Sequence, residues 1–496
     1  MKRARDFRQY IDVLKSLGEI QEIDWNLEMG AITRRSYELR TAAPLFNKIK
    51  GYPAGFRALG APIGLSANAK YPYARIAVSV GLEPEADILE IIETMSTWEK
   101  MSQRQPFNVV PDGKCKQNKM LGDEVDLLSF PSPLIHVGDG GRYFGTIGIL
   151  ITQTPDQKWT NWSVNRCMVQ GKNKLNLNIP GGILSSKHAG MIQAEWHKIG
   201  KPIPVAFVQG VEPLAVMISG MPLPDNVSEG ELLGAYVGEP LDMVRCETID
   251  LEVPADAEIV IEGFVGNGDC AMEGLMGEYS GFLVPGSSQE KPLMTITGIT
   301  YRDNPILPVC AAGEPAEENH TCWAVAIAAS ILGELWKQDF PVKTCFIPFE
   351  SAVQWLVVLI DSSWTLPADD IDGTEFCTSL GRAIFSTRGG INTPKAIIVR
   401  DDIDPTNLAE LVWAFATRCH SDIGEIHLPD LRHNSLEACL HTDETKTPLA
   451  PKTVYNCLFS GRSPGAHATR SSFKYNYPKE LQDKILSNWK SYGYRN

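Results

Sequence analysis

Gly145-Thr-Ile-Gly-Ile-Leu-Ile-Thr152 establishes the architecture of the central part of this 496-residue chain. It is a short run of apolar and β-branched residues punctuated by Gly, as expected of a largely buried β-strand. Pro204-Val-Ala-Phe-Val208 and Glu258-Ile-Val-Ile-Glu262 are similar runs, and all three lie in a Gly- and Pro-rich region, residues 125–309. This region predicts a largely antiparallel β-barrel or sandwich.

The regions on both sides of the barrel show mixed helical and strand patterns. The first opens with apolar residues at helical spacing, followed by Gly18 as a stop: Phe7, Tyr10, Ile11 and Leu14. The last contains two buried apolar runs, Trp355–Ile360 and residues 395–399, which alternate with helical stretches such as residues 405–417. Residues 324–336 predict a connecting helix. Near the end, Leu481, Ile485 and Trp489 share one helical face that suits docking onto another surface.

The length predicts about three domains. We expect an α+β multidomain protein with an N-terminal α/β domain (residues 1–124) and a central β-barrel (residues 125–322). A linker helix (residues 323–337) leads to a C-terminal α/β domain with a terminal docking helix (residues 338–496).

Composition excludes several classes of protein. The formal net charge of −14 disfavours a nucleic-acid or anionic-membrane binder, because these partners require a basic face. The eleven cysteines contain no CxxC, which favours reduced thiols in a cytoplasmic protein over disulfides or a zinc site. No apolar run is long enough to span a bilayer, and Met1-Lys-Arg-Ala-Arg5 is followed by Asp6 rather than by the apolar core of a signal peptide.

The chain also lacks the motifs of P-loop, dinucleotide-binding, serine-hydrolase and zincin proteins. Its strongest chemical signal is Glu273-Gly-Leu-Met-Gly-Glu-Tyr-Ser-Gly281, in which Glu273 and Glu278 lie in one Gly-rich segment. Thr160-Asn-Trp-Ser-Val-Asn-Arg166 supplies an arginine. A second carboxylate and an arginine shift the pKa of a carboxyl in opposite directions, so the three residues predict an acid/base site. The alternative is that they are loop charges and a surface arginine.

Neither a strand nor a helix brings Glu273 and Glu278 together, because a spacing of five residues separates their directions in both. We expect Gly274, Gly277 and Gly281 to adopt positive φ angles that re-aim both side chains into one cavity.

Asn161, His188 and Glu229 form a candidate site for a hard divalent cation. An amide oxygen, an imidazole and a carboxylate can combine around Mn²⁺ or Mg²⁺, with phosphate oxygens completing the shell. The alternative is the more usual one for each residue taken alone: a capped turn, a satisfied core polar group or a solvated charge. Strand alternation puts Asn161 and Arg166 on opposite faces, so a shared site requires a bulge or a curled strand end.

Further segments match a known family in order along nearly the whole chain. They include Gly30-Ala-Ile-Thr-Arg-Arg35, Pro131-Ser-Pro-Leu-Ile-His136 with Asp139-Gly-Gly-Arg142, Met221-Pro-Leu-Pro224, Glu318-Asn-His-Thr321 and Trp413-Ala-Phe-Ala-Thr-Arg418. Together with the segments around Arg166 and Glu278, they give a chain that resembles the UbiD family of prenylated-flavin decarboxylases, most closely its ferulic/cinnamic acid decarboxylase branch.

This resemblance implies a split β-barrel related to flavin reductases that binds prenylated FMN, and a C-terminal domain used for oligomerisation as a homodimer or larger homo-oligomer. It implies a flavin prenyltransferase as the supplier of the cofactor. The implied cofactor-binding residues are Asn161, Trp162, Ser163, Val164, Asn165, Arg166, Lys187, His188, Glu229 and Arg388. Mn²⁺ would be bound by Asn161, His188 and Glu229, and K⁺ near Trp162, Ile218, Ser219, Met221 and Glu229.

The resemblance also implies an activity: non-oxidative, reversible decarboxylation of an aromatic, heteroaromatic or α,β-unsaturated carboxylic acid through a covalent adduct with the cofactor. Glu278 would protonate the carbon that loses CO₂, and Arg166 and Glu273 would hold it and set its protonation state.

The chain departs from the family pattern in two regions. Gly181-Gly-Ile-Leu-Ser-Ser-Lys187 is inserted before His188, where it puts the local loop in doubt, and Lys187 replaces a neutral residue. In the expected substrate pocket, which includes Tyr279 and Leu436, Trp323 and Asn434 replace smaller aliphatic and aromatic groups. A larger indole and a polar amide predict a compact monocyclic substrate. A ferulate/cinnamate decarboxylase, a non-catalytic flavin-phosphate-binding protein and an FMN-dependent oxidoreductase are the alternatives.

Overall fold

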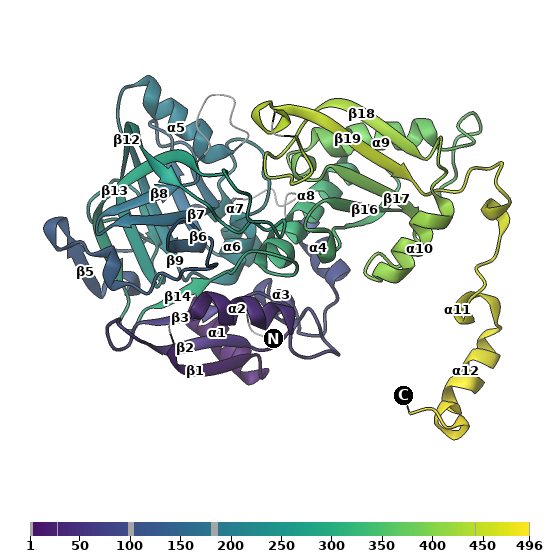
Figure 1. Ribbon diagram of the computed structural model, residues 1–496, viewed down its shortest axis with the longest axis horizontal. Helices are drawn as coiled ribbons and strands as arrows, with labels where there is room; N and C mark the ends of the chain where they lie inside the picture. Colours follow the sequence, from purple (N-terminus) through teal and green to yellow (C-terminus); the bar gives the residue numbers. More distant parts are fainter. Residues whose placement is uncertain (1–2, 27, 98–103, 180–186, 442, 496) are drawn as a thin grey trace.

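The computed structural model describes residues 3–26, 28–97, 104–179, 187–441 and 443–495. It contains a small N-terminal sheet, a central barrel and a C-terminal sheet, with helices on and between them (Figure 1). The fold is therefore the α+β multidomain arrangement that the sequence predicts.

The N-terminal layer is built on α1 (Phe7–Ser16), whose buried face contains the four predicted apolar residues. Asp6 caps this helix by accepting a hydrogen bond from the backbone N–H of Gln9. The helix lies beside the sheet β1 (Ile20–Asn26), β2 (Ala43–Ile49), β3 (Arg57–Gly60) and β14 (Ile306–Val309), with α2 (Met29–Glu38) also packed on it. Because β14 follows the barrel in sequence, the N-terminal sheet is completed by a strand from beyond the barrel.

The barrel is closed by six antiparallel strands in the order β12-β9-β6-β7-β8-β13, with β12 pairing back onto β13. Their bounds are β6 (Tyr143–Gln153), β7 (Thr160–Gly171), β8 (Lys174–Leu177), β9 (Ile203–Gln209), β12 (Ile259–Glu273) and β13 (Gln289–Tyr301), and β5 (Asn118–Leu121) extends the sheet beside β13. All three predicted strand runs belong to this ring, so the predicted barrel is confirmed.

Three helices lie on the barrel: α5 (His188–Lys198), α6 (Pro213–Ser219) and α7 (Glu229–Val237). A small sheet lies beside it, formed by β4 (Asn108–Val109), β10 (Asp242–Arg245) and β11 (Glu252–Pro254). Helices α3 (Ala74–Ser79) and α4 (Ile88–Ser96) join the apolar core around α8 (Ala324–Lys337), the predicted connecting helix. No described helix has the length and apolarity needed to cross a membrane.

The C-terminal sheet has the order β15-β16-β17-β19-β18. Its strands are β15 (Val342–Phe346), β16 (Trp355–Ile360), β17 (Lys395–Arg400), β18 (Glu425–Arg432) and β19 (Leu449–Asn456), with α9 (Thr374–Ser386) and α10 (Leu408–Arg418) packed on it. Beyond them, α11 (Phe473–Asn476) and α12 (Lys479–Ser487) form an arm that extends away from the body (Figure 1).

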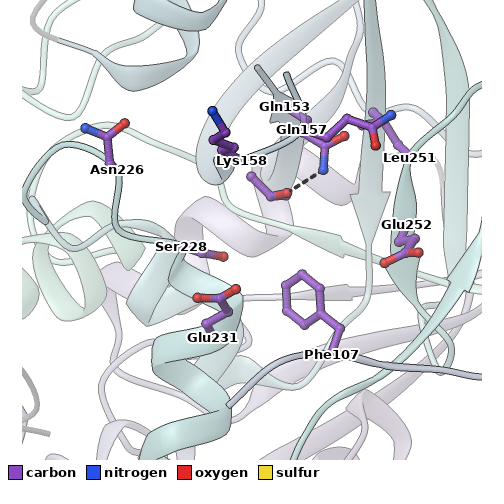
Figure 2. A pocket seen from close by; sticks show the side chains of 10 residues that line it. Phe107, Gln153, Gln157, Lys158, Asn226, Ser228, Glu231, Leu251 and Glu252 are labelled. Atoms are coloured by element: carbon purple, nitrogen blue, oxygen red, sulfur yellow. Dashed lines mark hydrogen bonds between the residues drawn. The ribbon is translucent and has the colours of Figure 1, made fainter. Parts of the chain in front are cut away.

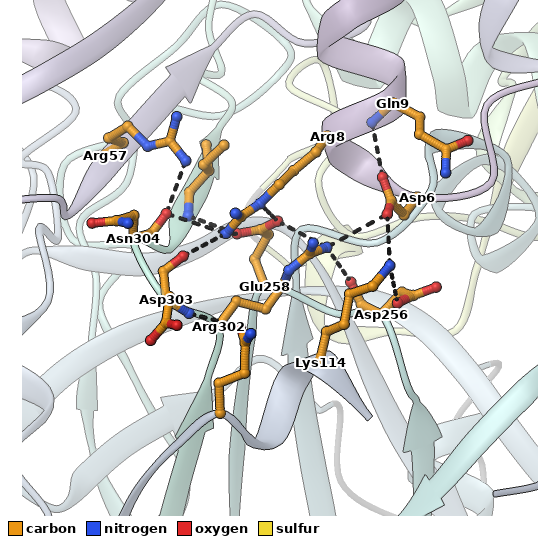
Figure 3. Close-up of polar contacts among 12 residues, drawn as sticks. Asp6, Arg8, Gln9, Arg57, Lys114, Asp256, Glu258, Arg302, Asp303 and Asn304 are labelled. Carbon is orange, nitrogen blue, oxygen red and sulfur yellow. Dashed lines mark hydrogen bonds and ion pairs between the residues drawn. The ribbon is translucent and has the colours of Figure 1, made fainter. Parts of the chain in front are cut away.

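A buried carboxylate joins the first helix to the barrel (Figure 3). Glu258, directly before β12, is fully buried and accepts hydrogen bonds from Arg8 Nε at 2.8 Å and Arg8 Nη2 at 2.9 Å. It also accepts a hydrogen bond from the backbone N–H of Ile306 at 3.1 Å, and Arg302 lies 3.4 Å away. Bidentate, charge-assisted bonds of this kind fix the position of one element relative to another.

Candidate active site

The structure brings Arg166, Glu273 and Glu278 together at one end of the barrel. Arg166 lies on β7, Glu273 is the last residue of β12, and Glu278 lies in the following loop. Arg166 Nε and Nη2 donate to the two carboxylate oxygens of Glu273 at 2.9 and 3.0 Å, and Nη1 donates to Glu278. The side chain of Glu273 is 3% exposed and that of Glu278 16%, so Glu278 is the carboxyl that a bound molecule can reach.

Glycines shape the turn between the two carboxylates, although not all in the predicted way. Gly274 and Gly281 have positive φ angles of 109° and 89°, as expected. The prediction is wrong for Gly277: its φ angle is not positive, and a Cβ atom there would lie 2.5 Å from the ring of His136. Gly277 is therefore needed for close packing rather than for an unusual backbone conformation.

The negative charges of Glu278 and Glu273 raise the pKa of Arg166. Burial by itself lowers the pKa of Arg166, but Glu278 and Glu273 together raise it above its ordinary value, so the guanidinium stays charged. Tyr143, on β6, donates a hydrogen bond to Glu273 Oε1 at 2.7 Å, and burial and the adjacent carboxylate raise the pKa of its phenol. Glu273 thus has partners on two sides, whereas Glu278 is bonded to Arg166 on one.

Asn161, His188 and Glu229 also meet, on the other side of β7. Asn161 Nδ2 donates to Glu229 Oε1 at 2.8 Å, and His188 Nδ1 lies 3.5 Å from Asn161 Nδ2 and 3.8 Å from Glu229 Oε1. His188 and Glu229 are the first residues of α5 and α7. All three are at least nine-tenths buried, and burial raises the pKa of Glu229 while the facing His188 lowers it.

Two details fit this cluster to a hard cation. His188 Nε2 donates to Asp225 Oδ1 at 3.1 Å, which places the ring proton on Nε2 and leaves the Nδ1 lone pair facing Asn161 and Glu229. Asn161 Oδ1 is buried and has no hydrogen-bond partner among the described residues. An oxygen, a nitrogen and a carboxylate with open lone pairs suit Mn²⁺ or Mg²⁺. Residues 181–186 of the insertion lie outside the described part of the chain.

The remaining predicted cofactor residues lie around these two clusters. Arg388 pairs with the same Asp225 that bonds His188. Lys187 is accessible to solvent, yet the surrounding protein and the positive charges of Arg166 and Lys291 lower its pKa to about 8. Between the clusters on β7, Ser163 accepts a hydrogen bond from Asn165 at 2.8 Å, Val164 is 37% exposed, and Trp162 is buried.

Strand β7 therefore carries residues of both clusters. Its pairing with β6 is irregular between Gly145 and Gly148, where β6 has an extra residue. The extra residue lies on β6, whereas β7 pairs regularly from Thr160 to Asn165, so this irregularity is not the predicted bulge in β7 between Asn161 and Arg166.

The residues expected near K⁺ lie at the end of α6. Ile218, Ser219 and Met221 are buried. The hydroxyl of Ser219 donates to the carbonyl oxygen of Ala215 at 2.7 Å, and the backbone N–H of Met221 donates to the carbonyl oxygen of Ile218 at 2.9 Å. The K⁺ site stays a prediction.

A cavity of about 190 Å³ is lined by residues adjacent in sequence to Asn161 and Glu229 (Figure 2). Its lining includes their chain neighbours Thr160 and Ser228, together with Phe107 and Glu231. The hydroxyl of Ser228 is buried and has no partner among the described residues.

The expected substrate-pocket residues surround Tyr279. The rings of Tyr279 and Trp323 pack edge to face, with centroids 5.3 Å apart. Asn434 Nδ2 lies 3.5 Å from the Tyr279 hydroxyl and 3.1 Å from Asn392 Oδ1, and Asn434 Oδ1 accepts a hydrogen bond from the backbone N–H of Leu436 at 3.1 Å. The loop after β12 and the C-terminal domain thus both contribute residues to the expected substrate pocket.

Sequence reasoning missed Tyr143, Asp225 and Asn392, which bond to Glu273, His188 and Asn434 respectively. Asp225 follows directly after Met221-Pro-Leu-Pro224, one of the segments that match the family, so its position carried a signal. Tyr143 and Asn392 have no local signal, because their contacts are made across the fold.

Comparisons with protein families identify the class of this protein. Three domain models of the family described as 3-octaprenyl-4-hydroxybenzoate carboxy-lyase match the chain: the N-terminal domain at residues 14–95, the Rift-related domain at residues 108–315 and the C-terminal domain at residues 320–457. The barrel and these matches define a carboxy-lyase. The chain belongs to the UbiD family of decarboxylases.

Two curated relatives align over the full length. The chain is 38% identical over 501 residues to pyrrole-2-carboxylic acid decarboxylase of Pseudomonas aeruginosa, and 37% identical over 502 residues to ferulic acid decarboxylase 1 of Saccharomyces cerevisiae, covering 99% of both chains in each case.

Solved structures share the fold. Vanillic acid decarboxylase of Sedimentibacter hydroxybenzoicus in its closed form superposes with a TM-score of 0.81 at 21% identity, covering 99% of each chain. The UbiD-class enzyme HmfF from Pelotomaculum thermopropionicum, in complex with FMN, has a TM-score of 0.78 at 24% identity, covering 98% of this chain and 100% of that one.

Proposed function

We propose that this protein decarboxylates a compact aromatic or heteroaromatic carboxylic acid with prenylated FMN as cofactor, by a reaction that is reversible in principle. The observation that carries the proposal is the bonding of one buried arginine, Arg166, to both Glu273 and Glu278. Family membership supplies the reaction class, and this cluster supplies a proton donor for it.

The proposed roles follow from burial and hydrogen bonding. Glu273 is buried against Arg166 and Tyr143, so it serves to hold the arginine in place. Glu278 faces the accessible side and gives a proton to the carbon that loses CO₂. Release of CO₂ from a ring carbon requires an electron sink, and prenylated FMN supplies that chemistry when bound.

Asn161, His188 and Glu229 would hold Mn²⁺ against the cofactor phosphate, with Arg388 as a nearby cation and K⁺ beside α6. The support is the open Nδ1 of His188 and the unpartnered Oδ1 of Asn161. We expect Glu229→Ala to lower metal content and flavin occupancy together, as measured by elemental analysis and absorbance. Full retention of both would overturn this ligand set. A flavin prenyltransferase would supply the cofactor in the cell.

The proton donor is tested with Glu278→Gln, which removes the transferable proton but keeps the size of the side chain. We expect turnover to be lost while cofactor occupancy is unchanged. Glu314→Gln, in an exposed residue near the same turn, is the control. Decarboxylation near the wild-type rate by a loaded Glu278→Gln protein would end the assignment.

A compact substrate is favoured by Trp323 and Asn434, which stand on either side of Tyr279. The 38% identical relative is named for a five-membered heteroaromatic acid, whereas the 37% identical relative is named for a phenylacrylic acid. Because the two sequence identities are nearly equal, they favour neither substrate class. The expected substrate therefore depends on the residues of the pocket.

We expect the wild type to prefer pyrrole-, furan- or hydroxybenzoic acids over cinnamic acid. Trp323→Ile with Asn434→Phe should shift the kcat/KM ratio toward cinnamic acid, because it removes an indole and a polar amide that costs about 1–3 kcal/mol when left unpaired. Wild-type preference for cinnamic acid would instead favour the phenylacrylic alternative.

We further propose a homodimer or larger homo-oligomer in a reducing compartment such as the cytoplasm. The described cysteines are free. The C-terminal arm carries no buried residue in α11 or α12 and exposes Tyr477, Leu481, Leu486 and Tyr492. Apolar side chains on a projecting arm suit a second copy of the chain. A monomer in sedimentation experiments at micromolar concentration would refute this assembly.

A further inference from the structure

A π-helical turn precedes α8 and lies against the loop that carries Glu278. This turn, η5, spans Asn319–Trp323. Wide turns of this kind are rare and occur often at functional sites. Trp323 packs on the ring of Tyr279 from this turn, and His320 reaches the backbone of the same tyrosine.

His320 is fully buried and bonds on both sides of its ring. Nε2 lies 3.0 Å from the carbonyl oxygen of Tyr279. Because a carbonyl oxygen only accepts, Nε2 carries a proton and donates it. On the other side, Nδ1 accepts a hydrogen bond from the backbone N–H of Glu317 at 3.1 Å and lies 3.2 Å from Glu317 Oε1.

Glu317 is itself fixed in place. It is fully buried and accepts hydrogen bonds from the backbone N–H of Asn319 at 2.8 Å and from Cys310 Sγ at 3.1 Å. Burial by itself raises the pKa of Glu317, but the facing His320 lowers it overall. Although Cys310, Glu317 and Glu318 lie close enough to share a metal ion, protein donors already satisfy the carboxylates.

Glu278 lies between two anchored peptide groups. Before it, the backbone N–H of Gly277 donates to Asp139 Oδ1 at 3.0 Å. After it, the carbonyl of Tyr279 accepts from His320. Beyond this point the loop is exposed, with Phe282 at 59% and Val284 at 46%. The bond from His320 is therefore an anchor between Glu278 and the exposed part of the loop.

We propose that Glu317 and His320 form a positioning pair that fixes the Tyr279 peptide and thereby holds the Glu278 carboxyl in its reactive place. This inference rests on the proposed role of Glu278 as proton donor. The backbone N–H of Glu317 orients the imidazole, and the imidazole holds the peptide. The carboxylate of Glu317 fixes this turn by accepting from the backbone N–H of Asn319. A displacement of about 1 Å at a reacting group costs on the order of a hundredfold in rate.

The test compares His320→Leu with His320→Gln, whose amide nitrogen can reach the position of Nε2. Thr321→Val is the matched control, since Thr321 is equally buried in the same turn and its hydroxyl lies 3.4 Å from the carbonyl oxygen of Glu317, away from Tyr279. Each loaded enzyme is assayed for kcat and KM. Hydrogen exchange by mass spectrometry is measured on the cofactor-free proteins, for peptides spanning residues 274–286 and for the barrel strands.

We expect His320→Leu to lower kcat about a hundredfold with little change in KM, and to speed exchange in residues 274–286 alone. His320→Gln should recover kcat to within about fivefold, the cost of one weakened hydrogen bond. If His320→Leu does not fold, Glu317→Gln tests the same link and should lower kcat with the same local rise in exchange.

Wild-type kcat and wild-type exchange in these variants would overturn the positioning pair, as would an equal loss in Thr321→Val. The Glu278→Gln variant separates this outcome from failure of the proposed function. If Glu278→Gln retains full turnover while His320→Leu still loosens residues 274–286, the anchor stands and the proton donor is misassigned.

Discussion

At the scale of single residues, Arg166 is the centre of the site, because one guanidinium bonds two carboxyl groups, the buried Glu273 and the more accessible Glu278. Its two bonds to Glu273 are parallel and bidentate, and its remaining nitrogen meets Glu278. A lysine would not match this geometry, because the three donors of its ammonium share one nitrogen and cannot form the parallel pair of bonds to Glu273.

Arg166→Ala should lower kcat/KM at least about a hundredfold, or about 3 kcal/mol of barrier, because it leaves Glu273 and Glu278 as like charges without a cation. Arg142→Ala serves as the control, since Arg142 is exposed and its side chain bonds only to the carbonyl oxygen of Ser132 among the described contacts. A loss below about tenfold for Arg166→Ala, with the cofactor bound, would show that the ion pairs do not support catalysis.

At the scale of elements, the turn after β12 depends on how closely a second loop approaches it. A Cβ atom on Gly140 would lie 1.4 Å from the carbonyl oxygen of Gly274, which is fixed backbone rather than a flexible side chain. The two loops are further tied by a hydrogen bond of 2.8 Å from the backbone N–H of Gly140 to the carbonyl oxygen of Leu275. The conformation of the Glu273–Glu278 turn is thus set partly by a segment more than a hundred residues earlier.

Gly140→Ala should therefore displace this turn, lowering the melting temperature by several degrees and activity by more than about tenfold. Gly171→Ala is a fair control, because a Cβ atom at Gly171 meets no atom within 4 Å and its φ angle is not positive. Calorimetry and initial rates of the two variants give the comparison. If both variants have the same melting temperature and the same activity, the close approach of the two loops does not control the position of the turn.

At the scale of the whole molecule, buried acids between domains make stability depend on pH. Glu318 accepts hydrogen bonds from Tyr37 of α2 and from the backbone N–H of Ile63 at 3.0 Å, so it joins the N-terminal layer to the turn before α8. Burial raises its pKa to about 7, with the nearby Glu317 adding to the shift.

Between the ordinary carboxyl pKa of 4.5 and about 7, the folded protein holds a proton on Glu318 that the unfolded chain releases. This contribution is present in full below pH 4.5 and is lost as pH rises through 7. The free energy of unfolding should fall across that window, by at most about 3 kcal/mol from this group. Glu318→Gln should flatten the fall in urea titrations, whereas the exposed Glu350→Gln should not. The same slope in both would assign the pH dependence to other groups.

The sequence by itself determined the elements and the class of fold. Apolar periodicity located α1, α8, β16 and the three barrel runs, because one buried face imposes a local pattern that a short window records. Ordered matches along the chain identified the family and named Arg166, Glu273 and Glu278, which the structure then brings together.

Only the tertiary structure decided how these elements meet. Several contacts join residues far apart in the chain. Strand β14 pairs with β3 of the N-terminal sheet, Tyr143 bonds to Glu273, and His320 bonds to the carbonyl oxygen of Tyr279. Gly277 shows the same limit, since its role comes from the neighbouring His136 rather than from its own backbone. Such contacts depend on barrel closure and strand register, which arise from packing across the whole molecule and leave no periodic trace in the local sequence.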